Sequence, residues 1–232
     1  EDPQLTMLEY VTNRPPVGWR KILRQCHSEL VAVQQKLDLN QPYFPRVPDI
    51  FKLFYKCPLR KIKAVIIGQD PYHQQLPDGS PRAQGLSFSV SRKDDIPSSL
   101  KNIYKVLEDC YPGYTRPDHG DLTAWVDKGV ALLNTDLTVM PNIAHSHKDI
   151  WSGFIKQIFR AIYENNKHAV FMLWGKHAQG AVKELGDKIH KVETSHPSGF
   201  SAHRGFSTSK CFLQANDILK KAGQEEIDWR IY

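Results

Sequence analysis

Short runs of apolar residues recur along the chain, and segments with helical spacing of apolar residues separate them. Three runs are rich in β-branched and aliphatic residues and stop at a glycine or a polar or aromatic residue: 64–67, 130–133 and 169–173. A weaker fourth run covers 188–194. Such short runs are typical of strands that are buried on both faces of a parallel sheet. The pattern therefore predicts four parallel strands.

Helical periodicity predicts the elements between and around these strands. We expect helices over 19–37, 175–185 and 206–222. A fourth helix is expected from an N-cap at Ser98 or Ser99 through Leu107. A fifth is expected to begin after an N-cap at Asp149, with an apolar face of Ile150, Phe154, Ile158 and Ile162.

The remaining segments predict loops and one terminal arm. Pro42, Pro45 and Pro48 enforce an irregular segment, and the polar residues 1–16 are expected to form a loosely held arm. No repeat or second-domain boundary interrupts the chain. Strands that alternate with helices form parallel sheets covered on both faces. We therefore expect one α/β domain over 1–232, with a short central parallel sheet of about four strands flanked by helices on both faces.

Polar groups follow all four predicted strands. They are Gly-Gln-Asp-Pro-Tyr-His at 68–73, Asn134, Trp-Gly at 174–175 and Ser-His-Pro-Ser at 195–198. Ligands of open α/β sheets bind beyond the carboxyl ends of the strands. One composite site is therefore expected at this edge.

Asp70 and His196 are the candidate catalytic groups. Pro71 stiffens the loop and biases Asp70 away from helix, which would hold the carboxylate at a rigid corner. The alternative is a side chain that caps its own turn. His196 precedes a Pro-Ser pair that stiffens its turn and offers donors, although a packed or surface histidine has the same pattern.

Asn134, Tyr72 and Phe88 are candidates for binding a flat ligand. An amide that follows an apolar strand is partly buried and must find partners, either in a turn or helix cap or in a ligand. Tyr72 and Phe88 can equally be core aromatics. Together the three side chains could stack a planar heterocycle and read its polar edge.

Composition adds broad limits. The chain of 232 residues and 26.6 kDa can bury a full core, and no apolar run is long enough to span a bilayer. A net charge of +6 favours a polyanionic partner without requiring one. The cysteines are far apart in sequence, which argues against a zinc knuckle and favours reduced thiols in an intracellular protein: Cys26, Cys57, Cys110 and Cys211.

Several functional classes lack their motifs. The chain has no phosphate-binding P-loop, no dinucleotide-binding Gly-rich turn after the first strand and no nucleophile elbow. His145 and His147 have no third partner at a metal-ligand interval, so we interpret them as solvated loop histidines. Neither a metal nor an organic cofactor is expected.

The loop motifs closely resemble those of the family-1 uracil-DNA glycosylases. The matching segments are Gly-Gln-Asp-Pro-Tyr-His (68–73), Gly-Leu-Ser-Phe-Ser-Val (85–90), Leu-Leu-Asn-Thr (132–135), Leu-Trp-Gly (173–175), His-Pro-Ser (196–198) and Ile-Asp-Trp (227–229). They occur in order from about Tyr43 to Trp229. The resemblance implies a cofactor-free repair enzyme that flips uracil out of DNA and hydrolyses its N-glycosidic bond, leaving free uracil and an abasic site.

The resemblance also implies residue roles. Asp70 would orient the attacking water and stabilise the cationic sugar, while His196 would donate, as a neutral ring, to the developing uracil oxyanion. The substrate would be bound by the backbone beside Gln69 at the pocket floor, by Tyr72 against a thymine methyl group, by Phe88 as a stacking platform and by Asn134 at the edge that separates uracil from cytosine. The expected DNA contacts are His73, Ser99, Gly175, Lys176, Ser198, Phe200 and Ser201.

This chain departs from the family pattern in four places. Gly199-Phe200 replaces the usual Pro-Leu, so we expect Phe200 to be the wedge that fills the space of the flipped base. Lys176 replaces a serine and should make DNA binding more salt-dependent. The segment 96–99 has fewer prolines than usual and is expected to be more mobile, and 74–82 is longer than the usual link.

Three other functions fit parts of the pattern: a DNA-binding module without catalysis, a glycosylase for other damaged bases, and a nucleotide- or flavin-binding domain. The expected partners are single- or double-stranded uracil-containing DNA and protein inhibitors that mimic DNA, with a monomeric enzyme and no membrane. The expected location is intracellular: nucleus or mitochondrion in a eukaryote, cytoplasm in a bacterium, host nucleus for a virus.

Overall fold

One parallel sheet forms the centre of the computed structural model, which describes residues 4–232. Its strands, in the spatial order β2-β1-β3-β4, are β1 (Ala64–Gly68), β2 (Val130–Asn134), β3 (Val170–Trp174) and β4 (His190–Thr194). All neighbours pair in parallel, which confirms the predicted strands. Every residue of β1, β2 and β3 is buried, whereas β4 at the edge exposes Lys191 and Glu193. These exposed positions explain the weaker apolar pattern of the fourth run, whereas β2, the other edge strand, is covered on both faces.

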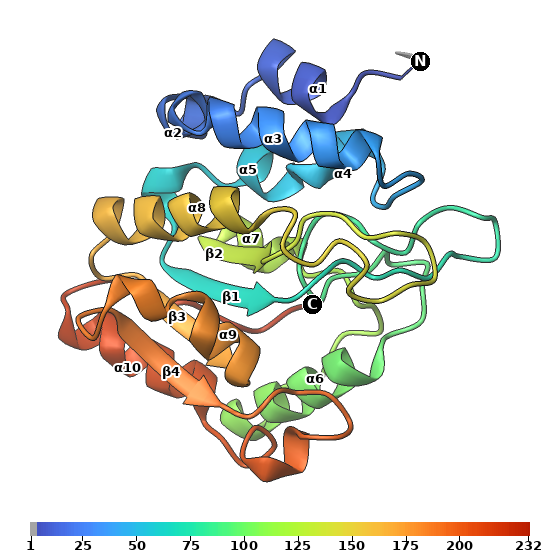
Figure 1. The fold of residues 1–232 in the computed structure, drawn as a ribbon. Coiled ribbons are helices and arrows are strands. Elements are labelled where there is room, and N and C mark those ends of the chain that lie inside the picture. Colours follow the sequence, from blue (N-terminus) through green and yellow to red (C-terminus); the bar gives the residue numbers. More distant parts are fainter. Residues whose placement is uncertain (1–3) are drawn as a thin grey trace.

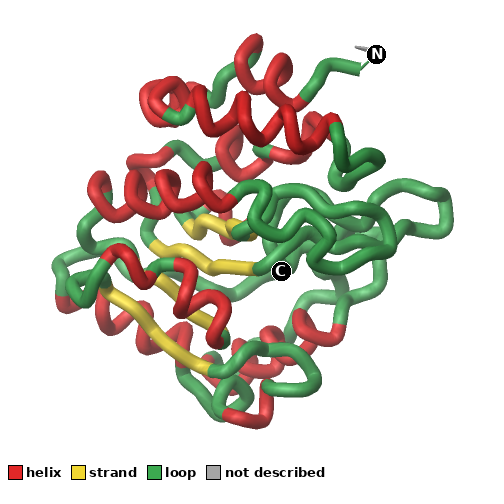
Figure 2. Tube along the Cα trace, in the orientation of Figure 1, coloured by secondary structure: helices red, strands yellow, loops and turns green. Residues whose placement is uncertain are grey.

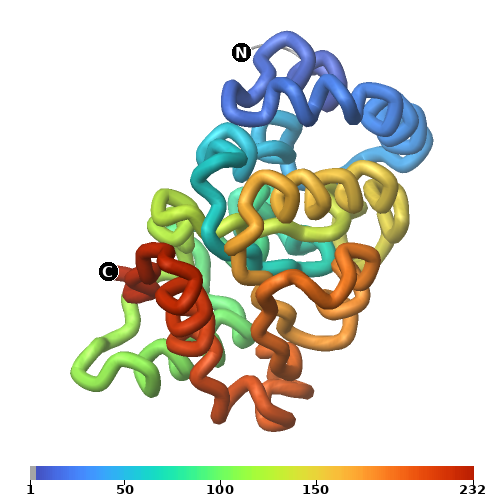
Figure 3. The backbone as a smooth tube through the Cα atoms, turned by 90° about the vertical axis from the view of Figure 1, so that its left-hand side faces the viewer, coloured from blue at the N-terminus to red at the C-terminus, as the bar shows by residue number. Residues whose placement is uncertain are grey.

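Helices cover both faces of the sheet, as predicted. The chain passes from β1 to β2 through α6 (Ser98–Cys110) and α7 (Thr123–Asp127), from β2 to β3 through α8 (Ser152–Asn165), and from β3 to β4 through α9 (Lys176–Ala181) and the 3-10 turn η3 (Lys183–Leu185). After β4 come η4 (Ala202–Arg204) and α10 (Cys211–Lys221). α8 and α9 lie on one face, and α6, α7 and α10 on the other (Figures 1 and 3). Right-handed crossovers that run in opposite directions from the sheet centre require this division.

The sheet opens between β1 and β3 at the carboxyl ends of these strands. β1 pairs with β2 along its full length, but its pairing with β3 ends at Ile66–Met172. The chain also leaves β1 toward one edge of the sheet and β3 toward the other, which makes this the topological switch point. Long loops gather at this edge (Figure 2). The opening is therefore where a ligand crevice is expected.

The N-terminal helices form a layer above α8 (Figure 1). They are α1 (Met7–Asn13), η1 (Val17–Trp19), α2 (Arg20–Gln25), α3 (His27–Asp38), α4 (Val47–Ile50), α5 (Lys52–Lys56) and η2 (Leu59–Lys61). The predicted helix 19–37 is therefore two helices. The chain turns at the fully buried Cys26, and Leu23 of α2 and Leu30 of α3 are buried on either side of this turn.

The predicted loose arm was wrong for its second half. Thr6 and Glu9 form a reciprocal capping box that begins α1, and Met7 and Val11 are buried one helical turn apart. The Thr-x-x-Glu pattern could have revealed this helix from sequence. Residues 1–3 lie outside the described residues.

The predicted helix caps were also wrong. Ser98 and Ser99 are the first residues inside α6, whose N-cap Pro97 makes no side-chain cap. The N-cap of α8 is Trp151, and the Asp149 side chain does not cap this helix, although the Asp149 carbonyl accepts a hydrogen bond from Ser152 Oγ (3.1 Å). The last two helices are shorter than the expected 175–185 and 206–222 because α9 gives way to a 3-10 turn and α10 begins at Cys211.

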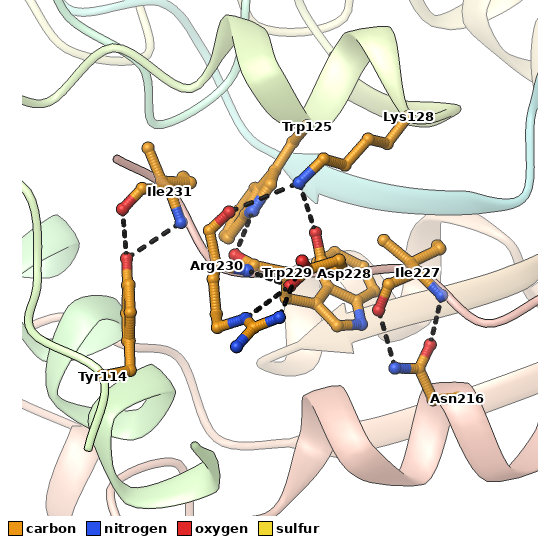
Figure 4. Close-up of polar contacts among 9 residues, drawn as sticks. All are labelled: Tyr114, Trp125, Lys128, Asn216, Ile227, Asp228, Trp229, Arg230 and Ile231. Carbon is orange, nitrogen blue, oxygen red and sulfur yellow. Dashed lines mark hydrogen bonds and ion pairs between the residues drawn. The ribbon is translucent and has the colours of Figure 1, made fainter. Parts of the chain in front are cut away.

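The C-terminal segment closes the α7–α10 face (Figure 4). The Asn216 amide of α10 donates to the carbonyl of Ile227 and accepts from its N–H, both at 2.8 Å. Trp125 Nε1 donates to the carbonyl of Trp229 at 2.7 Å, and the Trp229 side chain is fully buried. The Ile-Asp-Trp motif therefore belongs to the core packing and lies away from the crevice. Over residues 4–232, no helix combines the length and apolar character that a membrane span requires.

Candidate active site

A cavity of about 290 Å³ lies in the crevice at the carboxyl end of the sheet. Its walls include eight of the predicted site residues: Gln69, Asp70, Tyr72, His73, Phe88, Ser99, Asn134 and His196. These residues come from the loops after β1, β2 and β4, from the segment 83–88 and from the start of α6. The composite site expected from the strand ends is thus assembled around one cavity.

The absence of a side chain at Gly68 leaves space for the Asn134 amide. A Cβ atom on Gly68 would lie 2.2 Å from Asn134 Oδ1 and 3.0 Å from Ser87 Cβ. Paired strands place the two residues side by side at the ends of β1 and β2. Because glycine leaves this space free, the amide of Asn134 crosses the end of β1 and reaches the cavity wall while only 8% of the residue is exposed.

The backbone of Phe88 has a positive φ of +65°, which residues other than glycine rarely adopt. Such a residue costs on the order of 1–3 kcal/mol and persists only when its surroundings determine it. Tyr72 Oη donates to the Phe88 carbonyl at 3.0 Å, and the preceding Ser87 donates through its N–H to the Leu132 carbonyl at 3.2 Å. The Phe88 ring also packs against Trp174, with ring centroids 5.6 Å apart. These contacts fix one aromatic face of the cavity.

The Asp70 carboxylate is fixed from the far side of the cavity. Its Oδ2 accepts a hydrogen bond from the N–H of His145 at 2.7 Å, and its side chain is only 13% exposed. The carbonyl of Gln69, one residue earlier, accepts from both Thr135 Oγ1 (3.0 Å) and Asp136 N–H (2.9 Å). The Gln69–Asp70 peptide is therefore pinned to the loop after β2.

His196 is prepared to donate a hydrogen bond as a neutral ring. The N–H of Ser198 donates to His196 Nδ1 at 3.0 Å, which assigns the proton of the neutral ring to Nε2. Burial, and then the charge of His177, lower the pKa of His196. Gly175 allows the close approach of β3 and β4 loops here, since its φ is +96° and a Cβ would lie 3.1 Å from His196 Cβ.

These features coincide with a match to a known family. The sequence profile described as the Uracil DNA glycosylase superfamily matches residues 54–220, well over half of the chain. The chain belongs to this superfamily. The predicted family and the enzyme class, a uracil-DNA glycosylase of DNA repair, are thereby confirmed.

Individual relatives agree over nearly the whole chain. The chain is 42% identical to the uracil-DNA glycosylase of Yersinia enterocolitica over 216 residues, which covers 92% of each sequence. It is 40% identical to that of Yersinia pestis, covering 93% of this chain and 96% of the relative. The crystal structure of mimivirus uracil-DNA glycosylase superposes with a TM-score of 0.87 at 27% identity, over 94% of this chain and 87% of that one. A variant of mimivirus UNG in complex with UGI gives 0.88 at 27% identity, over 98% and 91%.

The cavity is not lined by the other five predicted DNA contacts, which are Gly175, Lys176, Ser198, Phe200 and Ser201. Three of them lie in the loop after β4. Ser201 Oγ donates to the His196 carbonyl at 3.0 Å and lies 2.9 Å from Ser198 Oγ. Ser195 Oγ donates to the Ser201 carbonyl at 2.7 Å. Within this hydrogen-bonded loop, Phe200 is 90% exposed. The loop is therefore braced by its serines, while its one aromatic side chain extends into solvent.

Two other predicted DNA contacts differ in where they lie: His73 lines this cavity, whereas Lys176 borders a neighbouring hollow that Gln69 also lines. His73 Nδ1 is buried and has no hydrogen-bond partner among residues 4–232, although the His73 carbonyl accepts from the N–H of Asn142 at 2.8 Å. An orphaned buried nitrogen beside a cavity is a candidate to bind a ligand. Lys176 is exposed at the first position of α9 and follows Gly175 behind His196.

The paired histidines were interpreted incorrectly in one case. His147 is 1% exposed, with Nδ1 2.7 Å from Thr138 Oγ1 and Nε2 3.1 Å from the Asn40 carbonyl, so it is a core residue and not a solvated one. His145 is half exposed, but its backbone orients Asp70. No sequence signal identifies this backbone contact. Among residues 4–232, no group of three or more His, Cys, Asp or Glu side chains could hold a metal ion.

Proposed function

We propose that this site hydrolyses the N-glycosidic bond of a uracil nucleotide flipped out of DNA, leaving free uracil and an abasic site. The observation that carries the proposal is that Asp70, His196 and Asn134 line the same cavity, with His196 Nε2 as the free donor. Flipping a base costs a few kcal/mol, which contacts in the pocket offset.

Three side chains would recognise the base. The Phe88 ring would stack on its face, and the Asn134 amide would accept from uracil N3–H and donate to O4. Cytosine presents the opposite polarity at these positions. The Asn134 side chain fills the space that Gly68 leaves free and is only 8% exposed, and this burial supports the selectivity, because a fixed amide discriminates better than a rotating one. Tyr72 would occupy the space that a thymine methyl group needs, which is exclusion by shape.

The chemistry would separate charge along the breaking bond. As the C–N bond lengthens, the sugar becomes cationic and the uracil gains negative charge on its oxygens. The neutral His196 would donate from Nε2 to this oxyanion, an interaction that strengthens in the transition state. Asp70 would orient the attacking water and stabilise the cationic sugar, and the bond from His145 N–H holds its carboxylate in place. A transfer of the water proton to solvent and protonation of the uracil anion complete the hydrolysis.

The predicted DNA contacts would bind the DNA backbone and fill the space of the flipped base. His73, Ser99 and Ser198 would bind phosphates, Gly175 and Ser201 would line the same track, and Lys176 would add a charge contact. Phe200 would enter the duplex as the wedge, which its 90% exposure supports. Stacking of an aromatic ring on bases contributes about 1–3 kcal/mol, so Phe200→Ala should lower kcat/KM on duplex substrate about 5- to 150-fold. Val17→Ala removes a similarly exposed apolar side chain from η1 and is the control; unchanged duplex activity in Phe200→Ala would exclude the wedge.

We also infer the partners and the location. The substrate is uracil-containing DNA in single or double strands, the enzyme acts as a monomeric single domain, and its place of action is intracellular because DNA is there. The structure of the mimivirus UNG variant is a complex with UGI. By likeness, a protein inhibitor that mimics DNA is expected to bind the same predicted DNA contacts.

A cleavage assay tests the proposal. An oligonucleotide with one uracil is incubated with the enzyme in excess EDTA, beside matched thymine and cytosine strands and an Asp70→Asn, His196→Ala double variant. Abasic product from the uracil strand alone, lost in the double variant, is the expected result. DNA binding without product would overturn it in favour of a binding module, and product that requires added metal would refute the cofactor-free chemistry.

A further inference from the structure

The extra segment 74–82 is an ordered hairpin that ends beside the uracil pocket. Gln75 and Pro81 form an antiparallel bridge, and the N–H of Leu76 donates to the Ser80 carbonyl at 2.8 Å. At the tip, Asp78 Oδ1 accepts from the N–H and the hydroxyl of Ser80. The hairpin therefore delivers its last residue, Arg82, to a defined position.

Arg82 is locked to a carboxylate in the loop before α6. Its Nη2 donates to Asp94 Oδ1 at 3.0 Å, and its Nε lies 2.8 Å from Asp94 Oδ2. The Asp94 side chain is 5% exposed and that of Arg82 is 24% exposed. Asp94 Oδ1 also accepts from the N–H of Asp95 at 2.7 Å. Of the two contacts between Arg82 and Asp94, only the first has hydrogen-bond geometry, because Arg82 Nε and Asp94 Oδ2 are buried without a hydrogen-bond partner among residues 4–232. One hydrogen bond and one close ion contact therefore hold the guanidinium group against the carboxylate.

The fixed guanidinium group lies against the Tyr72 ring. Arg82 Cζ is 5.9 Å from the ring centroid, within the range of a cation–π contact. The Tyr72 hydroxyl is held separately by the Phe88 carbonyl at 3.0 Å. The ring is thus restrained at its hydroxyl by the stacking segment and at its face by the hairpin.

We propose that Arg82, oriented by Asp94, is a positioning residue that fixes the Tyr72 ring and thereby sets the discrimination of the pocket against thymine. The inference rests on the proposed role of Tyr72 as the wall that excludes a 5-methyl group. A buried ion pair adds little net stability over apolar side chains of the same size, so rigid orientation is the effect to expect from this pair. Exclusion by shape needs such rigidity, because a ring that moves aside admits the methyl group.

The test compares excision of thymine and of uracil from the same sequence context. Arg82→Met keeps the length of the side chain but loses the charge and the planar fork. We expect its ratio of thymine to uracil kcat/KM to rise about tenfold or more, which is the discrimination that one methyl group can provide. Uracil excision should fall by less than tenfold. Arg82→Lys, which keeps the charge without the fork, should lie between the variant and the wild type.

Matched variants separate positioning from folding and from the role of Tyr72. Arg92→Met removes a 63% exposed arginine whose Nε lies 3.6 Å from Asp121, and should leave the ratio unchanged. Tyr72→Ala should raise the ratio most. A wild-type ratio in Arg82→Met together with a raised ratio in Tyr72→Ala would overturn the inference alone, whereas an unchanged ratio in both would overturn the role of Tyr72 as well. If thermal melting shows that Arg82→Met is unfolded, the double variant Arg82→Met, Asp94→Leu leaves no unpaired charge and decides by the same ratio.

Discussion

Gly68→Ala adds one methyl group at the point where β1 ends against the Asn134 side chain. The new Cβ would lie 2.2 Å from Asn134 Oδ1, whereas ordinary van der Waals contact begins at 3.4 Å. The amide must therefore move by about 1 Å, since Ser87 Cβ at 3.0 Å leaves the methyl group no other direction. Displacement of a substrate-positioning group by 1 Å costs about 100-fold in rate, or about 2.7 kcal/mol. Overpacking should also lower the free energy of unfolding by about 1–3 kcal/mol.

The assay is kcat/KM for uracil excision, with urea denaturation to show that the variant is folded. Gly180→Ala is the control, because a Cβ there meets no heavy atom within 4 Å among the described residues. It should leave kcat/KM unchanged and, since Gly180 lies in α9, raise stability by about 0.5–1 kcal/mol. A folded Gly68→Ala enzyme within twofold of wild-type kcat/KM would refute the reasoning, because the position of Asn134 could then not matter.

Three further predictions concern protonation, the C-terminal segment and salt. Burial lowers the pKa of His196 below its usual 6.5, so kcat/KM should fall toward acidic pH with a midpoint below pH 6.5. This decrease should be absent in His196→Ala. A midpoint above pH 6.5 would contradict a neutral donor. Protonation also favours the unfolded chain, so the stability linked to this group is lost as the pH falls. Asn216→Leu leaves the N–H and carbonyl of Ile227 without their partner and should lower the free energy of unfolding, measured by urea denaturation, by about 2–4 kcal/mol. Asp217→Asn, at the exposed neighbouring position, is the control and should change this free energy little. A decrease below about 1 kcal/mol in Asn216→Leu would refute the importance of these bonds. Lys176→Ser should reduce the slope of log affinity against log salt by up to about 0.9 for duplex DNA, and an unchanged slope would show that Lys176 makes no phosphate contact.

Local sequence determined the strands of the sheet and the candidate chemistry of the site. Apolar runs such as 64–67 are buried wherever they pack, so their pattern predicts strands without knowledge of their neighbours. Pro71 restricts Asp70, and a strand end places His196 at the sheet edge, so both residues could be found as candidates. The order of the loop motifs then indicated the family, and the match to the family profile confirmed it.

Tertiary packing decided how these candidates are held. The break at Cys26 is one such case, because the buried residues Leu23, Cys26 and Leu30 keep helical spacing across it and their periodicity does not specify a change of direction. The pairing of β1 with β3 ends early, and this depends on contacts between strands that lie far apart in the sequence, which a local pattern does not specify.

The contacts that orient the site join separate loops. The N–H of His145 reaches Asp70 across 75 positions, and Arg82 reaches Tyr72 and Asp94 through a hairpin whose length alone carried no functional signal. Residue types and local spacing determine what a side chain can do. Only the packed structure determines which backbone N–H, carboxylate or ring meets it, because those partners arrive from elements that are separated in sequence and brought together by burial of the core.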